Sequence, residues 1–216
     1  MNVEGSPTAL AELQRLGAPL VPAVAVGNRV VHGWNPRGVA ELVGAQYVQP
    51  ERLSPEELAR RLDTILLASQ RAIRQVPDDR LEMKSPERDR TVRNLGYHIF
   101  RLSLAFRDGM AERRFPEEWL QETAPPQILD GAALARYGQS VRDSLAEWFS
   151  RPGAWAGAVE TYYGPQTGHE LLERTAWHAA QHLRQLYALL QMMGVAPDRP
   201  LTETDFGGLP LPEALW

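Results

Sequence analysis

Cysteine is missing from all 216 residues of this chain. Without a thiol, the chain can form no disulfide, offers no thiolate to a metal and has no cysteine nucleophile of its own. Any transition-metal chemistry must therefore use imidazole and carboxylate groups. Lysine is almost as scarce, because Lys84 is the single lysine among 23 basic residues, a bias from which we infer no function.

The sequence also lacks a surplus of positive charge, since 27 acidic residues against 23 basic ones leave a net charge of −4. Such a chain has no global positive field to hold a phosphate backbone or an anionic lipid, so we expect neither nucleic acid nor a membrane as partner. No apolar run approaches the roughly 20 residues of a membrane span, and the start of the chain lacks the order of a signal peptide. We therefore expect a cytoplasmic protein that acts on a small molecule.

A hydrophobic content of 44% with 23% charged residues is typical of a globular protein that buries a core. Within residues 53–194, apolar side chains recur at helical spacing, and the helix starts carry strong signals such as Ser54 followed by Pro55. The fold class that this pattern predicts is mainly α, an up-down four-helix bundle. A tail rich in proline and glycine follows at 195–216. The four expected helices cover residues 55–76, 90–112, 130–150 and 168–193.

Residues 1–48 follow a different pattern. A helical stretch from Thr8 ends at Gly17, two short β-branched runs flank Gly27-Asn28, and a second helix begins at Pro36. This helix, strand, strand, helix order predicts a small separate domain.

Over about 1–44, with Val21-Pro22 before the first strand and Gly33-Trp34 after the second, this segment resembles the C-terminal half of a glutaredoxin or thioredoxin-like domain. In that family the Val-Pro bond is typically cis and lies beside the redox dithiol. Redox activity does not carry over to a segment without cysteine. We expect a docked appendage or a dimerisation element, and we leave His32 outside the functional site.

Two histidines stand four residues apart in the last expected helix. Because a helix turns once every 3.6 residues, His178 and His182 project from one face, which is a metal-ligand spacing. His98 on the second bundle helix offers a third imidazole. Three such groups can hold Zn, Ni, Fe or Mn and leave positions open for water, a substrate or a small thiol. The alternative is that these histidines are hydrogen-bonded core or surface residues.

The motifs Leu95-Gly-Tyr-His98-Ile and His178-Ala-Ala-Gln-His182 resemble the ligand motifs of the DinB-like superfamily, a group of damage-inducible and thiol-transferase four-helix bundles. The resemblance covers about residues 55–194. It implies a divalent metal, usually Zn or Ni, bound by His98, His178 and His182, and it implies frequent homodimers. It further implies transfer or isomerisation reactions that use a low-molecular-weight thiol such as mycothiol, bacillithiol or glutathione.

Several polar residues lie within about a turn of the three histidines. A glutamine or glutamate there can orient a ligand imidazole, and an arginine can bind a substrate carboxylate, although exposure to solvent is the commoner fate. We expect His169, at the start of the last helix, to lie outside the ligand set. Some aromatic residues near the loop before that helix could wall a pocket or simply belong to the core: Trp155, Tyr162, Tyr163 and Trp177. The polar neighbours are Asn94, Arg101, Glu173, Arg174, Gln181 and Gln185.

Two hypotheses of different classes follow. The first is a metal-dependent enzyme, either a small-thiol-dependent S-transferase or isomerase or a metal-assisted hydrolase. The second is a non-catalytic dimeric stress-response or binding module with a vestigial or structural metal site. The sequence identifies no catalytic residue beyond the expected ligands.

Overall fold

A computed structural model describes residues 6–18, 23–32, 35–48, 51–86 and 89–215. Contacts divide the chain into two compact units, Met1–Glu51 and Arg52–Trp216. Within the ranges just given, no helix is both long enough and apolar enough to cross a membrane.

The first unit contains α1 (Pro7–Arg15), β1 (Ala23–Val26), β2 (Arg29–His32) and α2 (Pro36–Val43), so the expected order of elements is confirmed. The strands pair antiparallel from Ala23↔His32 to Val26↔Arg29, and Gly27 in the turn has a φ of 61°. The Val21-Pro22 bond and the Gly33-Trp34 pair lie outside the described residues. The likeness to a thioredoxin half-domain therefore stays a resemblance.

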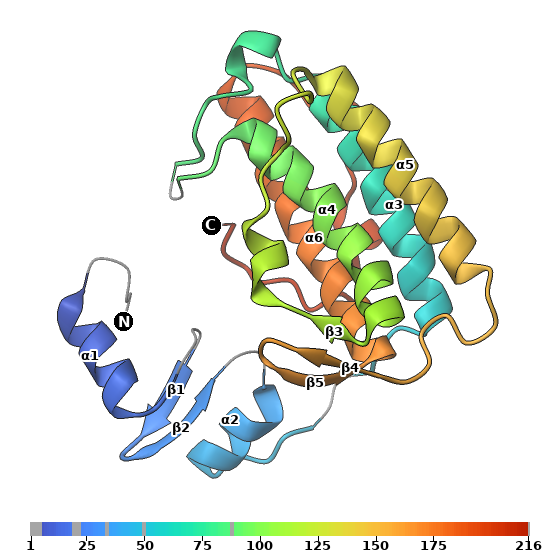
Figure 1. The fold of residues 1–216 in the computed structure, drawn as a ribbon. Helices are drawn as coiled ribbons and strands as arrows, with labels where there is room; N and C mark the ends of the chain where they lie inside the picture. The colour runs from blue at the N-terminus through green and yellow to red at the C-terminus, as the bar shows by residue number, and fades with distance from the viewer. Residues whose placement is uncertain (1–5, 19–22, 33–34, 49–50, 87–88, 216) are drawn as a thin grey trace. The chain divides into compact units, whose positions relative to one another are not determined.

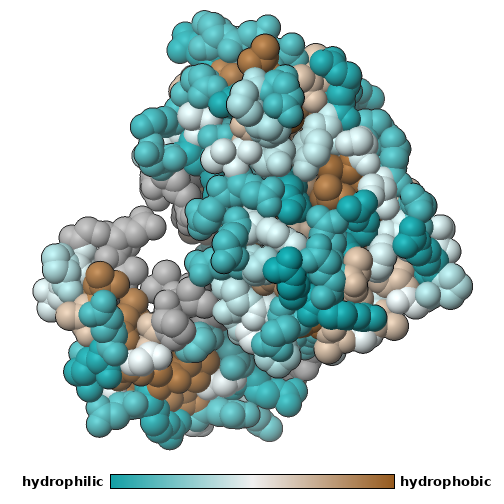
Figure 2. Space-filling model, in the orientation of Figure 1, coloured by the Kyte–Doolittle hydropathy of each residue, from teal (hydrophilic) through white to brown (hydrophobic). Residues whose placement is uncertain are grey.

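Apolar side chains remain exposed on the first unit, as the brown surface over its elements shows (Figure 2). They come from the helix α1, the strand β1, the helix α2 and the segment after it: Leu10, Val24, Val26, Val43 and Val48. The expectation that this unit is a docked appendage or a dimerisation element stays a prediction.

The second unit is the predicted four-helix bundle, which the structure confirms (Figure 1). Every bundle helix begins at a side-chain cap whose oxygen accepts a backbone N–H of the first turn: Ser54, Thr91, Asp130 and Thr167. These caps explain why the sequence signals placed the helix starts to within two residues. The helices are α3 (Pro55–Arg74), α4 (Val92–Glu112), α5 (Gly131–Phe149) and α6 (Gly168–Met192).

The order of the helices differs from simple up-and-down alternation. In the bundle, α3 and α4 each pack between α5 and α6, so helices consecutive in sequence are diagonal in two of three cases. His169 at the start of α6 contacts the carbonyl of Leu53 before α3, and Gly96 near the start of α4 lies against Leu134 near the start of α5. These contacts make α3 parallel to α6 and α4 parallel to α5.

The physical cause is the connection between α4 and α5. It forms β3 (Arg114–Phe115) and a 3₁₀ helix η2 (Glu117–Gln121), and then returns along α4, where Ala124 donates its N–H to Asn94 near the beginning of that helix. The connection, residues 113–130, has 18 residues, which is enough to travel back over the roughly 30 Å length of a 20-residue helix. As a result α5 begins at the same end of the bundle as α4.

A three-stranded sheet closes the end of the bundle where α4 ends and α6 begins (Figure 1). Here β4 (Ala158–Thr161) forms a hairpin with β5 (Gly164–Thr167), and β3 pairs in parallel with β4. The parallel pair was not predicted, because Phe115 and Thr161 are far apart in sequence. This sheet places Phe115 and the tyrosines 162 and 163 beside the first turns of α6.

The C-terminal tail runs over the bundle and includes a single helical turn, α7 (Glu203–Phe206). A separate 3₁₀ turn, η1 (Asp78–Arg80), follows the end of α3. Leu201 donates its N–H to the hydroxyl of Tyr187, and Arg61 donates to the carbonyl of Asp205. Beyond Pro212 the tail crosses α6 and contacts Gln181 and Gln185. The bundle core and the tail thus meet at the helix that carries two of the candidate ligands.

Candidate metal centre

Three histidines come together between the antiparallel neighbours α4 and α6. His98 comes from α4, and His178 and His182 come from successive turns of α6. One ring nitrogen from each can be chosen so that all three atoms lie within 4.8 Å of one another. The ring of His98 lies 5.2 Å from that of His178 and 5.0 Å from that of His182. The structure therefore brings together the three residues that the spacing and the family motifs selected.

The ring nitrogens of the α6 pair converge. Nε2 of His178 and Nε2 of His182 are 3.1 Å apart. Two nitrogen ligands of a tetrahedral zinc ion with Zn–N bonds of about 2.0–2.1 Å are separated by about 3.3 Å, so the observed spacing is close to that of a ligand pair. In the remaining part of the chain that the structure describes, no other group of three metal-ligating side chains meets the same criterion.

Gln185 fixes which nitrogen of His182 faces the cluster. The amide nitrogen of Gln185 donates to the carbonyl oxygen of Leu215 at 2.8 Å, and a backbone carbonyl only accepts, so the amide oxygen must point the other way. That oxygen lies 2.6 Å from Nδ1 of His182 and accepts its proton. The lone pair of His182 is then on Nε2, the atom that faces His178. Such a partner is typical of metal-binding histidines.

Burial keeps His178 neutral. Only 4% of His98 and 8% of His182 are exposed, and His178 is partly buried between them and the ring of Trp177 at 6.0 Å. Burial lowers the pKa of His178 well below its ordinary value of 6.5, and the neighbouring His182, His98 and Arg174 lower it further. The His178 imidazole is therefore neutral at pH 7 and has a lone pair to offer a cation.

Of the other polar residues that the sequence singled out, some lie beside the histidines and others form contacts elsewhere in the bundle. Gln181 donates to the carbonyls of Ala214 and Leu215 and so holds the tail next to the histidines. Asn94 caps a backbone N–H of the connection after α4, and Glu173 pairs with Arg52 at 3.6 Å. His169 hydrogen-bonds to Leu53 and lies outside the cluster, as expected.

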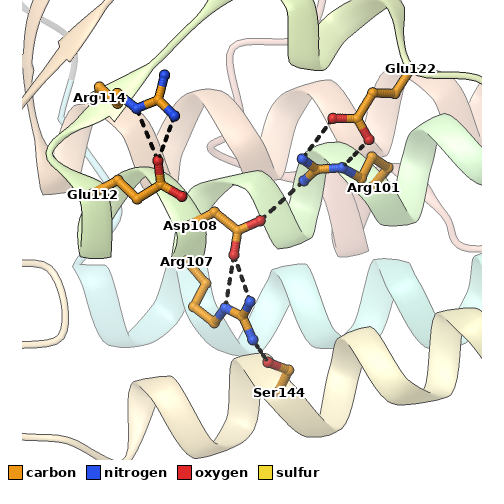
Figure 3. Close-up of polar contacts among 7 residues, drawn as sticks. All are labelled: Arg101, Arg107, Asp108, Glu112, Arg114, Glu122 and Ser144. Atoms are coloured by element: carbon orange, nitrogen blue, oxygen red, sulfur yellow. Dashed lines mark hydrogen bonds and ion pairs between the residues drawn. The ribbon is translucent and has the colours of Figure 1, made fainter.

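Arg101 belongs to a network of ion pairs one turn along α4 from His98. Its guanidinium binds both oxygens of Glu122, at 2.6 and 2.8 Å, and reaches Asp108 at 3.2 Å (Figure 3). Asp108 in turn binds Arg107, which donates to Ser144 of α5. With 11% of its side chain exposed and Trp119 5.3 Å away, Arg101 attaches the connection after α4 to the bundle. The positive charge of Arg101 is therefore neutralised by Glu122 and Asp108 of the protein itself.

Of the aromatic residues near the start of α6, one packs against the core and two lie next to Arg174. Trp155 packs against Phe149, and both are partly buried against the core. Tyr162 and Tyr163 pack edge to face, 4.8 Å apart, and both lie beneath the guanidinium of Arg174. Phe115, which the sequence did not mark, joins them through the β3–β4 pairing. No local pattern could have found it, because only the parallel pairing places it there.

Comparison with protein-family models gives no match, and neither does comparison with curated proteins. Among solved structures, the chain is similar to YfiT from Bacillus subtilis, described as a probable metal-dependent hydrolase with an unusual four-helix bundle topology. The TM-score is 0.54 and the sequence identity 15%, over 70% of this chain and 96% of the YfiT chain. At this identity the likeness concerns the fold: the second unit is a four-helix bundle of the kind found in YfiT.

Proposed function

We propose that this protein is a metal-dependent enzyme in which His98, His178 and His182 bind one divalent ion, and that its reaction is a metal-assisted hydrolysis. The observation that carries the proposal is the convergence of three ring nitrogens within 4.8 Å, with Nε2 of His182 directed inward by Gln185. The DinB-like motifs and the description of YfiT as a probable metal-dependent hydrolase support the same reading.

The donor set suits an ion with catalytic character. Three neutral imidazoles hold a zinc- or nickel-like ion without cancelling its charge, and they leave positions open, whereas structural zinc sites have four protein ligands. A divalent ion bound by three imidazoles supplies Lewis acidity that polarises a carbonyl and acidifies water. Zinc or nickel is the expected metal, with iron or manganese as alternatives.

The chain's own residues would hold the ligand imidazoles in position and exclude water from part of the site. Gln185 holds the His182 ring in one orientation through the Nδ1 hydrogen bond, and the tail behind Gln185 fixes that amide. Packing between α4 and α6 excludes water from the His98 side, since that residue is 4% exposed. His178 is the least buried of the three, so a substrate would approach from its side.

The activity test uses purified protein loaded with zinc or nickel and a panel of chromogenic esters and amides. We expect turnover that falls at least 100-fold in H98A, because the lost ligand removes the ion. H169A is the matched control, since His169 is another bundle histidine that hydrogen-bonds to the Leu53 carbonyl and lies outside the cluster. Hydrolysis that is equal in H98A and the wild type would rule out metal-assisted hydrolysis.

Thiol-dependent transfer or isomerisation, which the DinB-like motifs imply, would use the same ion with a small thiol in the open position. The same panel with added glutathione, bacillithiol or mycothiol distinguishes the two reactions. If the loaded protein turns over nothing in either panel and the histidine variants still bind a partner protein, the non-catalytic binding module replaces the enzyme. A homodimer and a cytoplasmic location remain predictions.

A further inference from the structure

Arg174 lies one helical turn before His178 on α6. Residues four apart on a helix project from the same face, so its side chain starts from the face that carries the histidines. The guanidinium carbon lies 4.9 Å from the ring centre of Tyr163, 5.7 Å from that of Phe115 and 6.0 Å from that of Tyr162. A positive charge is thus held on an aromatic wall next to the candidate metal centre.

No acidic residue that the structure describes forms an ion pair with this arginine. Among the residues that the structure describes, no carboxylate lies within ion-pair distance of Arg174, and its one hydrogen bond goes to the hydroxyl of Tyr162 at 3.1 Å. Its neighbours differ: Arg101 binds Glu122 and Asp108, and Arg114 binds Glu112 (Figure 3). A partly buried guanidinium that keeps most of its N–H groups unused is ready to receive an anion.

A second group at the same place lacks a partner. The hydroxyl of Tyr163 is buried and has no hydrogen-bond partner among the described residues. Buried polar groups are normally satisfied, and an exception calls for an explanation such as a bound water, an ion, local strain or a functional role. Tyr163 supports Arg174 from below, at the shortest of the three ring distances. The ring that lies nearest to Arg174 therefore carries a second polar group with unused hydrogen-bonding capacity.

The size and shape of the charge indicate the class of anion. A guanidinium forms two parallel hydrogen bonds with a planar carboxylate, and one such group neutralises one negative charge. A phosphate dianion would keep a charge uncompensated on the aromatic wall, because Arg101 is already neutralised by Glu122 and Asp108. Aromatic rings next to the cation also provide an apolar surface for the body of the ligand.

We infer that Arg174 and the rings of Phe115, Tyr162 and Tyr163 form a carboxylate subsite, so that the substrate is a small carboxylic acid whose reactive group lies at the three histidines. To call the bound carboxylic acid a substrate, the inference rests on the proposed function. The subsite itself stands on the contacts of Arg174 and exists whether or not a metal is bound.

The test is calorimetric titration of the full chain with benzoate, benzamide and phenyl phosphate, once with zinc and once after chelation. We expect benzoate to bind the wild type in both states, and R174Q to bind it at least 10-fold more weakly in both. The affinity of R174K for benzoate should lie between those of the wild type and R174Q, because lysine keeps the positive charge but cannot form two parallel hydrogen bonds with a carboxylate. Benzamide should bind weakly and equally to all. The matched control is R151Q. The guanidinium carbon of Arg151 also lies over an aromatic ring, 5.1 Å from the ring centre of Trp148, but this ring does not belong to the proposed subsite.

Equal affinity of wild type and R174Q for benzoate, with both proteins folded by circular dichroism, would overturn the subsite. Tighter binding of phenyl phosphate than of benzoate would overturn the choice of a carboxylate. Dependence on Arg174 in the chelated protein supports the subsite even if the zinc titration shows no metal binding. That pattern would make the proposed function fail while the subsite stands.

Discussion

Gln185 and His182 are joined by a hydrogen bond of 2.6 Å from Nδ1 of the imidazole to the amide oxygen. The amide nitrogen of the same glutamine is bound to the carbonyl of Leu215, so the tail determines how the amide is oriented. One side chain therefore links the C-terminal segment to the nitrogen that a metal would bind.

Replacing Gln185 by alanine should weaken metal binding. Without the acceptor on Nδ1, the His182 ring is free to rotate and to exchange tautomers, and loss of such a partner typically costs 10- to 100-fold in metal affinity. Competition titration with a chromogenic zinc chelator measures the change.

Q181A is the matched control, because Gln181 also donates to Leu215, whereas the hydrogen bond to Nδ1 of His182 is made by Gln185. It should leave the zinc affinity within about 3-fold, which we take as the scatter of such context effects. If Q185A binds zinc as tightly as Q181A does, the hydrogen bond has no part in the site.

The capping box of α6 should contribute stability that disappears in acid. Glu170 accepts from the backbone N–H and the hydroxyl of Thr167, while Glu170's own N–H donates to that hydroxyl. Burial raises the pKa of Glu170, but these hydrogen bonds and nearby Arg52 hold it below its ordinary value of 4.5. A carboxylate with a lowered folded pKa stabilises the protein above its unfolded pKa, and the contribution is lost as the pH falls through the folded value.

E170Q should therefore lower the free energy of unfolding by about 0.3–1 kcal/mol at pH 7, the usual contribution of a negative charge near a helix N-terminus, because glutamine keeps an oxygen that can accept the hydrogen bonds of Thr167. The difference between E170Q and wild type should shrink below pH 4.5, where the wild-type carboxylate takes up its proton. Urea unfolding at pH 7 and at pH 3.5 measures it. A difference that stays constant between the two pH values would contradict the role of the charge.

The parallel contact between α4 and α5 requires a small residue at position 138. A Cβ atom built on Gly138 would lie 2.6 Å from the ring of Phe100. Overpacking of this kind costs about 1–3 kcal/mol, so G138A should lower the melting temperature by several degrees.

A double-mutant cycle with F100L tests the cause. Leucine at position 100 removes the ring edge that the new methyl group meets, so G138A should cost less in the F100L background than in the wild type. If the two substitutions add without coupling, the close contact between these helices is not what limits the size of residue 138.

Much of the bundle could be predicted from local signals. The caps Ser54, Thr91, Asp130 and Thr167 place the helix starts, and the i, i+4 spacing places His178 and His182 on one face. His98 joined them only through the family motifs and the bundle geometry, because nothing near it in sequence marks a ligand. Metal binding itself stays a prediction.

What the sequence did not predict depends on contacts between distant segments. The return of the connection after α4, which makes α4 and α5 parallel, depends on where Ala124 meets Asn94, 30 positions earlier. The place of Phe115 beside Arg174 depends on a two-residue parallel pairing with β4. Periodicity and capping describe one element at a time, so they carry no information about such pairings.

The metal content of the untagged protein tests the central claim most directly. Elemental analysis of the wild type, after dialysis against zinc or nickel, should give about one ion per chain, and the ion should raise the melting temperature. H98A, H178A and H182A should each lose it, while H169A keeps it. A wild type without stoichiometric metal and without a rise in melting temperature on adding zinc or nickel would contradict the account.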